Sequence, residues 1–334
     1  MNTRLLTTAQ AAEGAEILRS GGLVAIPTET VYGLGASGLD TDAVKRIFEV
    51  KGRPQDNPLI LHVASAEDLP KWCRDIPPEA MLLAEKFWPG PLTMVLYKQP
   101  EVPLQVTAGL DTVAMRCPDH AATRELIRLA DVPVAAPSAN LSGKPSTTTA
   151  QHCIHDLWGK IDAILDGGPC RVGVESTILD LTVFPPRILR PGGVTLEQLR
   201  ALLPEVEMDP GLVKAGETPK APGMKYRHYS PQAEVRLLRG TREAFRAYVA
   251  GLPDEGTAVL CYEGEEAGYP GKRTLCFGRE DDPASLAARV FDCLRELDTP
   301  EVKLICVPCP EETGVGRAVV NRLKKAAGGN ILCL

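Results

Sequence analysis

The chain has 334 residues, enough for two domains that each bury their own core. Hydrophobic residues make up 44% of the sequence and charged residues 24%, the ordinary balance of a globular protein in water. With 37 lysines and arginines against 43 acidic residues the net charge is −6, which argues against a surface built for nucleic-acid phosphates but not against a local basic pocket.

The N-terminus and the cysteines both favour the cytoplasm. Residues 1–6 lack the long apolar core and cleavage site of a signal peptide, and no apolar run approaches the ~20 residues that span a bilayer. Ten scattered cysteines without a secretion signal indicate reduced thiols.

Cys306 and Cys309 form a C-x-x-C after a predicted strand. Two thiols cannot complete a zinc site, and redox chemistry is the weaker interpretation because neither is clearly at a helix N-terminus.

Residues 1–203 alternate between apolar runs and helical spacing, which predicts an α/β domain; the family resemblance described below implies that its sheet is twisted and mixed. The predicted helices cover residues 8–19, 41–50, 78–88, 121–130, 150–158 and 196–203. The predicted strands cover residues 23–26, 59–63, 92–97, 112–115, 133–136, 161–165, 177–181 and 187–189.

Residues 204–232 are rich in proline and glycine and are predicted to be a linker. The rest of the chain, 233–334, starts a new set of strands and helices that predicts a smaller, Rossmann-like three-layer αβα domain. Its predicted strands cover 235–238, 258–262, 273–277, 303–307 and 331–334, and its predicted helices cover 242–250, 285–297 and 317–327.

The first candidate ligand-binding stretch runs from residue 22 to residue 62. Residues 33–38 fit G-x-G-x-x-G, but Lys51 and Arg53 stand where a ribose-binding acid is needed. Close approach of a neighbouring strand explains these glycines better than a dinucleotide. Lys51 and Arg53 suit a helix C-terminus, but two prolines stiffen the loop that carries Arg53 and Asn57. A stiff loop with a guanidinium and an amide favours phosphate oxygens.

Two buried strands carry an imidazole and a guanidinium. Periodicity alone leaves His62 open between a core histidine and a ligand-binding one. Arg116 ends an apolar strand, where a guanidinium requires a carboxylate from the protein or from a ligand. If the carboxylate comes from a ligand, an amino acid or a carbamate is expected.

Small hydroxyl residues gather after the strand at 133–136. Six of them, with Asn140, exceed what helix capping needs, and an anion at a helix N-terminus would use the surplus. Ser176 and Arg190 lie in ordinary turns but add to this polar set. The sequence contains no P-loop, no H-E-x-x-H, no G-x-S-x-G and no S-x-x-K.

These segments together resemble the YrdC/Sua5 family, in the right order and over nearly the whole chain. The resemblance is carried by PTETVYGL at 27–34, KGRP at 51–54 with NPL at 57–59, WPGPLT at 88–93, PSAN at 137–140 and ST at 176–177. The segment 222–231 makes the chain similar to the long, Sua5-type members, with residues 1–203 as catalytic domain, 204–232 as linker or lid and 233–334 as C-terminal domain.

The resemblance implies a threonylcarbamoyl-AMP synthase, which condenses L-threonine, bicarbonate and ATP with magnesium and releases pyrophosphate. It implies no organic cofactor and no bound metal of the protein's own. Other proteins, tRNA threonylcarbamoyltransferases, would pass the product to adenosine 37 of tRNA; direct tRNA binding is not supported by the composition.

Catalysis would rest on Lys51, Arg53 and Arg116. L-Threonine would be held by Thr30, His62, Arg116, Ala136 and Ser176. ATP would be held by Arg53, Asn57, Thr112, Ser138, Ser146, Arg190 and Tyr229, or less favourably Tyr226 in place of Tyr229.

Two other functions are compatible with parts of the sequence. Basic and aromatic residues alternate over 225–229, as in single-strand RNA-binding platforms, but the acidic chain makes an RNA-binding module the poorer hypothesis. A carbamoyl-transfer enzyme with another acceptor would share the first domain's chemistry, and a requirement for threonine distinguishes the two.

Overall fold

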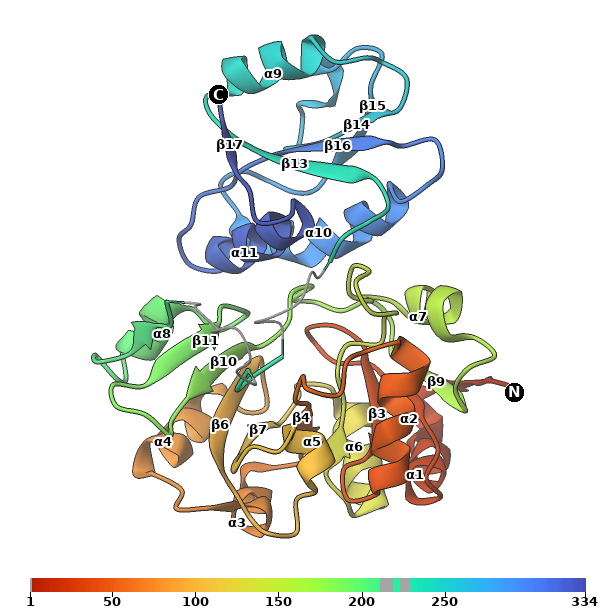
Figure 1. The fold of residues 1–334 in the computed structure, drawn as a ribbon, viewed down its shortest axis with the longest axis vertical. Coiled ribbons are helices and arrows are strands. Elements are labelled where there is room, and N and C mark those ends of the chain that lie inside the picture. Colours follow the sequence, from red (N-terminus) through yellow and green to blue (C-terminus); the bar gives the residue numbers. More distant parts are fainter. Residues whose placement is uncertain (1, 211–218, 223–228) are drawn as a thin grey trace. The chain divides into compact units, whose positions relative to one another are not determined.

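The computed structural model describes residues 2–210, 219–222 and 229–334, which divide into two compact units (Figure 1). The first unit comprises Met1–Ser142, Ser146–Arg171 and Glu175–Lys225. The second comprises Gly143–Pro145, Val172–Val174 and Tyr226–Leu334.

Every helix and strand predicted for the first unit is present, with ends that move by up to three residues. The helices are α1 (Ala11–Arg19), α2 (Thr41–Lys51), α3 (Leu69–Trp72), α4 (Pro78–Phe87), α5 (Leu104–Thr107), α6 (Ala121–Ala130), α7 (Ala150–Leu157) and α8 (Leu196–Arg200). The strands are β1 (Arg4–Thr7), β2 (Val24–Ile26), β3 (Gly33–Ser37), β4 (Ile60–His62), β5 (Cys73–Arg74), β6 (Leu92–Lys98), β7 (Thr112–Arg116), β8 (Val134–Ala135), β9 (Ala163–Asp166), β10 (Thr177–Asp180), β11 (Arg187–Arg190) and β12 (Glu207–Met208).

Within the described residues these twelve strands form one mixed sheet in the order β1-β9-β2-β3-β8-β4-β7-β6-β10-β11-β12, with β5 beside β6. Strand β3 contains the first two glycines of the G-x-G-x-x-G pattern. A Cβ at Gly35 would come within 3.1 Å of the Val24 carbonyl oxygen, and one at Gly33 within 3.1 Å of the Ala136 Cβ. The glycines therefore allow close approach of neighbouring strands, as predicted.

Helices cover one face of this sheet completely and only half of the other. On the first face, side chains of α2, α4, α7 and α8 pack on Leu61, Met94 and Met115. On the second face, α1 and α6 cover the half that includes β2, β8 and β9. The half formed by β4, β7, β6 and β10 carries instead a small apolar cluster, which consists of Ile60, Val95, Ala114, Ile178 and Ala221. This uncovered half is where the polar side chains lie.

Helix α2 begins and ends where local chemistry predicts. The Asp40 carboxylate accepts hydrogen bonds from the backbone N–H groups of Asp42 and Ala43, and so caps the first turn. Gly52 ends the helix in the left-handed conformation, with φ of 61°. This termination fixes Lys51 in the last turn and starts the loop that carries Arg53.

The second unit contains every element predicted for residues 233–334. Its strands are β13 (Glu234–Arg239), β14 (Thr257–Cys261), β15 (Arg273–Cys276), β16 (Leu304–Pro308) and β17 (Leu332–Cys333). Its helices are α9 (Arg242–Ala250), α10 (Pro283–Glu296) and α11 (Gly316–Ala326). The strands form a sheet in the order β15-β14-β16-β13-β17, and all the pairings are parallel.

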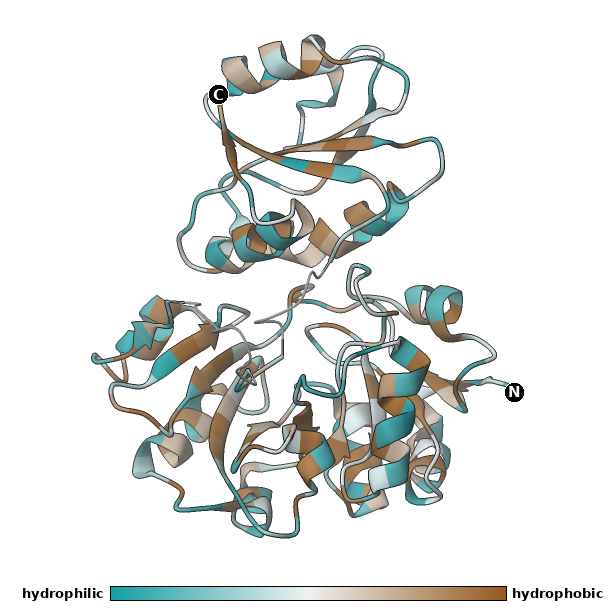
Figure 2. Cartoon of the chain, viewed as in Figure 1, coloured by the Kyte–Doolittle hydropathy of each residue, from teal (hydrophilic) through white to brown (hydrophobic). Residues whose placement is uncertain are grey.

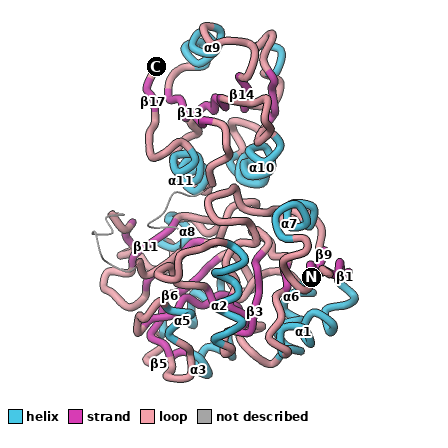
Figure 3. Tube along the Cα trace, turned by 45° about the vertical axis from the view of Figure 1, so that its right-hand side comes forward, coloured by secondary structure: helices cyan, strands magenta, loops and turns pink. Residues whose placement is uncertain are grey.

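This second sheet is buried on both faces, which confirms the predicted three layers. Figure 1 shows α9 on one side of the sheet, with α10 and α11 on the other, and Figure 3 shows α10 beside α11. Phe245 and Val249 of α9 pack against Leu238, Val259 and Cys306. Strands buried on both faces are hydrophobic along most of their length, as the brown of β14 and β16 in Figure 2 illustrates.

The ten cysteines are all free thiols, and seven of them are buried. Cys306 lies in the middle of β16, where burial raises the pKa of its thiol to about 11. Cys276 and Cys309 are half-buried, and Cys333 alone is exposed. In the described part of the chain, no helix is long and apolar enough to cross a membrane.

Candidate active site

Three polar side chains stand side by side on the uncovered face of the first sheet. His62 of β4 is in register with Arg116 of the parallel strand β7, and Arg116 is opposite Thr93 of the antiparallel strand β6. Residues paired in register point to the same face of a sheet. All three are buried, Thr93 completely. The register thus forms a polar row from side chains that are far apart in the sequence.

Ser176 and Arg190 extend this row. The hydroxyl oxygens of Thr93 and Ser176 lie 2.8 Å apart. The Arg190 guanidinium donates to the Ser176 carbonyl oxygen at 3.0 Å and to its hydroxyl at 3.2 Å. The structure therefore brings together His62, Arg116, Ser176 and Arg190, with Thr93 as the link between the second and the third.

The carboxylate that pairs with Arg116 belongs to the protein. Its guanidinium forms an ion pair with Glu29 at 2.8 Å, and the two side chains are only 4% and 2% exposed. Glu29 also accepts a hydrogen bond from the Asp119 backbone N–H at 3.1 Å. The sequence left open whether the carboxylate partner of Arg116 comes from the protein or from a ligand. In the structure it comes from the protein, so the carboxylate of a bound ligand would share the guanidinium with Glu29.

Buried polar atoms in and beside this ion pair have no hydrogen-bond partner among the described residues, namely one carboxylate oxygen of Glu29 and Nδ1 of His62. The amide oxygen of Asn57, in the loop before β4, also lacks a partner. Buried polar groups without partners are costly unless water or a ligand satisfies them. Burial, and next the nearby Arg116 charge, lower the pKa of His62 to about 3. The imidazole is therefore neutral near pH 7 and can act only as a hydrogen-bonding group.

Three further predicted site residues are attached to the same elements: Thr30 adjoins Glu29, Ala136 follows β8 and Thr112 begins β7. The hydroxyl oxygens of Thr30 and Thr28 are 2.9 Å apart, and both residues are buried. The Ala136 backbone N–H donates to the Ile60 carbonyl at 3.0 Å, which joins the end of β8 to β4. Thr112 precedes Arg116 by four residues on β7 and so faces the same side.

The expected phosphate-binding residues lie on two loops that contact each other. The Lys51 ammonium donates to the carbonyl oxygens of Ser138 and Asn140, and its side chain is buried. Arg53 donates to the carbonyl oxygens of Asn57 and Pro58, at 3.2 and 3.1 Å. In this structure both cations thus hold backbone carbonyls, and they order the loops that follow α2 and β8.

Ser146 lies further along the loop after β8, where its hydroxyl donates to the Glu175 carboxylate at 2.6 Å. Ser146 is completely buried and Glu175 nearly so. Glu175 is adjacent to Ser176, so this hydrogen bond ties the hydroxyl-rich loop after β8 to the start of β10.

Comparison with known proteins decides the family. The family Sua5/YciO/YrdC, described as "Telomere recombination", matches residues 16–192. The chain belongs to this family. A second match, described as "Threonylcarbamoyl-AMP synthase, C-terminal domain", covers residues 194–328.

Named relatives of this Sua5/YciO/YrdC chain match it over nearly its whole length. The threonylcarbamoyl-AMP synthase of Pyrococcus abyssi is 50% identical over 95% of this chain and 94% of its own. That of Bacillus subtilis is 45% identical over 97% of this chain and 94% of its own. The crystal structure of P. abyssi Sua5 complexed with L-threonine covers all of both chains, at 45% identity and a TM-score of 0.93.

Part of the predicted linker is described, and it lies on the uncovered face. Ala221 is fully buried in the apolar cluster with Ile60, Ala114 and Ile178. Lys220 forms an ion pair at 2.9 Å with Asp180 of β10. This short segment therefore covers the sheet at Ala114, which lies two residues before Arg116 on β7.

Of the two linker tyrosines, Tyr226 lies outside the described residues. Tyr229 belongs to the second unit, where its ring centroid is 5.1 Å from that of Phe291. The Arg322 guanidinium lies over the same ring at 5.7 Å. Tyr229 is therefore positioned by the core of the second unit.

Sequence reasoning assigned no role to Glu29, Thr93 and Glu175, although each contacts a predicted site residue. All three lie in the motifs that carry the family resemblance or next to them: PTET at 27–30, WPGPLT at 88–93 and the turn before β10. Their position beside the expected residues was the available signal. Their partners could not be read from spacing, because sheet register brings them together.

Proposed function

We propose that this chain is an L-threonylcarbamoyladenylate synthase, which condenses L-threonine, bicarbonate and ATP and releases pyrophosphate. The observation that carries the proposal is the buried row of His62, Arg116 and Ser176 on one sheet face, with unsatisfied polar atoms beside it. The names of the full-length relatives, and the L-threonine complex of P. abyssi Sua5, support the same activity.

In this proposal L-threonine occupies the polar row. Its carboxylate would bind the Arg116 guanidinium, with the neutral His62 and the hydroxyls of Thr30 and Ser176 as further hydrogen-bonding groups. Ala136 would contribute backbone contacts. The amine would react with bicarbonate to form a carbamate and water, a step for which positioning of the reactants is the main requirement.

ATP would lie beside the carbamate. The residues proposed to hold it are Arg53, Asn57, Thr112, Ser138, Ser146, Arg190 and Tyr229. A carbamate oxygen would attack the α-phosphorus, and the bond between that phosphorus and pyrophosphate would break. Lys51 and Arg53 would exchange their carbonyl contacts for phosphate oxygens and stabilise the leaving charge.

Magnesium enters this scheme as part of the nucleotide substrate. Among the described residues, no group of three or more His, Cys, Asp or Glu side chains could hold a metal ion of the protein's own. The divalent ion would neutralise phosphate charge, and the protein would contact the nucleotide through its cations and hydroxyls.

The domain roles follow from the same proposal. Residues 1–203 would carry catalysis, and the linker 204–232 would close over the reactants, because a carbamate is short-lived in water. Residues 233–334 would form the C-terminal domain. A cytoplasmic tRNA threonylcarbamoyltransferase would receive the adenylate for transfer to adenosine 37 of tRNA.

The test is pyrophosphate release from ATP measured with each substrate omitted in turn. The proposal expects release only when threonine and bicarbonate are both present. Ser176→Ala should raise the KM for threonine, because it removes a hydroxyl from the polar row, whereas Ser20→Ala, at an exposed position outside it, should not. Pyrophosphate release that persists without threonine would overturn the proposal and favour a carbamoyl transfer to another acceptor.

A further inference from the structure

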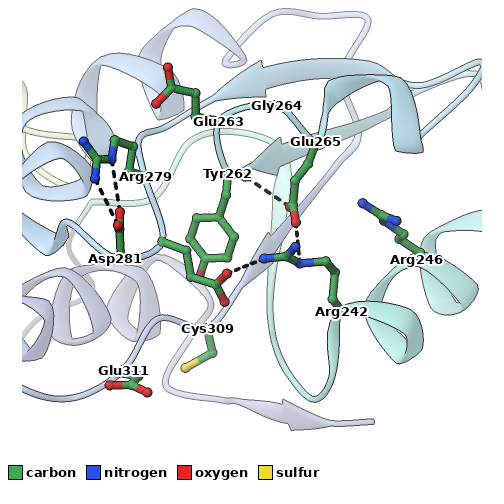
Figure 4. A pocket seen from close by; sticks show the side chains of 11 residues that line it. Arg242, Arg246, Tyr262, Glu263, Gly264, Glu265, Arg279, Asp281, Cys309 and Glu311 are labelled. Atoms are coloured by element: carbon green, nitrogen blue, oxygen red, sulfur yellow. Dashed lines mark hydrogen bonds and ion pairs between the residues drawn. The ribbon is translucent and has the colours of Figure 1, made fainter.

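The second unit has a pocket of its own, about 770 Å³ in volume, at the carboxyl edge of its parallel sheet (Figure 4). Its lining comes from the segments that follow four neighbouring strands, β13, β14, β15 and β16. In an open parallel sheet, ligands bind outside the carboxyl ends of the strands, where successive connections leave toward opposite faces. Strands β13 and β16 are such a pair, because α9 and α11 lie on opposite faces of the sheet.

Ion pairs and a ring contact link the side chains that line this pocket. Glu265 is 8% exposed at its side chain and forms an ion pair with Arg242 at 2.6 Å. Arg242 also pairs with Glu280, and Arg279 pairs with Asp281 at 3.0 Å. The Tyr262 ring stacks on Phe277, with 5.4 Å between centroids, and Figure 4 shows it in the middle of these charged groups.

The charge of the lining decides what class of ligand fits. Three arginines face five acidic residues, which leaves a formal excess of two negative charges. Glu263 and Glu311 are exposed at the rim, and neither has an ion pair within the described residues. A nucleotide or an RNA backbone would meet net repulsion here, even though the position resembles that of a nucleotide site.

We infer that this pocket binds a small organic cation, of the class of amines and guanidines with two or more positive charges. The volume lies in the range of small-molecule sites. The two unpaired carboxylates would bind the cationic groups, and the Tyr262 ring would offer an aromatic surface to them. The inference is independent of the proposed synthase activity, because its ligand and its residues belong to the second unit alone.

The experiment titrates the full-length protein calorimetrically with agmatine, putrescine and spermidine, in the absence of ATP and threonine. We expect saturable binding of at least one of these cations, weakened by added salt. The variant Glu263→Gln/Glu311→Gln should bind it about tenfold more weakly, because two ion pairs are lost. Both side chains are exposed, so the fold should be unaffected.

A matched control carries the same loss of charge at the opposite edge of the sheet. Glu255→Gln/Glu301→Gln removes two exposed carboxylates that precede β14 and β16, and it should bind as the unaltered chain does. The inference is overturned if none of the three cations binds, or if both double variants lose affinity equally. Binding of the dianion succinate at this pocket, without binding of the cations, would also overturn it.

Discussion

Glu29 is the residue on which the geometry of the polar row depends most. It is buried beside Arg116, and removal of one partner of a buried ion pair leaves an uncompensated charge. We expect Glu29→Gln to lower the free energy of unfolding by about 3–5 kcal/mol. Urea denaturation of the purified variant measures this loss.

The control for Glu29 is an exposed ion pair of the same chemistry. Glu125 and Arg128 on α6 are 45% and 63% exposed, so Glu125→Gln should cost less than about 1 kcal/mol. Equal decreases in the free energy of unfolding for the two variants would show that burial does not strengthen the contribution of the Glu29–Arg116 pair.

His62 makes the stability of the fold depend on pH. Its pKa falls from 6.5 to about 3 on folding, so between these values the unfolded chain binds a proton that the folded chain does not. This contribution to stability is fully present above pH 6.5 and is lost as the pH falls toward 3. Each pH unit in that window costs about 1.4 kcal/mol.

The corresponding measurement compares unfolding free energies at about pH 6 and about pH 5. His62→Asn should reduce the loss between them by about 1.4 kcal/mol, because the titrating group is gone. Gln151→Asn, at an exposed position on α7 without a titrating group, should leave it unchanged. An unaltered slope in His62→Asn would mean that the buried imidazole accepts a proton in the folded state.

At the scale of single elements, strands were predicted best where they are apolar and helices where their spacing is regular. Strand β4 and helix α6 lie within one residue of their predicted ends. Strands β1 and β3 were not predicted, because Arg4–Thr7 is short and half polar and Gly33–Ser37 contains no β-branched residue. Tertiary pairing, with β9 and with β2, supplies what local propensity lacks.

The described linker segment should matter for catalysis although it is distant in sequence from the polar row. Ala221→Asp would place a carboxylate among Ile60, Val95 and Ala114, which costs several kcal/mol unless the segment leaves the sheet. We expect threonine-dependent pyrophosphate release to fall at least about tenfold. Ala201→Asp, exposed after α8, is the control. Full activity of Ala221→Asp would show that this segment need not cover the face.

For the whole molecule, net charge gives a further prediction. A chain with a formal charge of −6 should show no salt-sensitive gel shift with tRNA, because sequence-independent binding requires neutralisation of phosphates. Electrophoresis at two salt concentrations measures this. A shift that disappears at the higher concentration would support the RNA-binding alternative, which depends on residues 225–229, four of them outside the described part of the chain.

The layered architecture of both units could be predicted because it follows from the alternation of apolar strands and amphipathic helices. The charged pocket of the second unit could not. Its lining extends from Arg242 to Glu311, and only the parallel order of four strands brings these loops to one edge. The Glu29–Arg116 pair escaped prediction for the same reason.

The distribution of the thiols has a practical outcome for spectroscopy. Seven cysteines are buried, and burial raises the pKa of the Cys306 thiol in the C-x-x-C pair, which disfavours its reactive thiolate form. A maleimide dye at neutral pH should therefore attach first to Cys333, near the C-terminus. A single fluorophore could then be attached to the second unit without prior mutagenesis. Its position would be distant in sequence from the residues proposed to bind threonine.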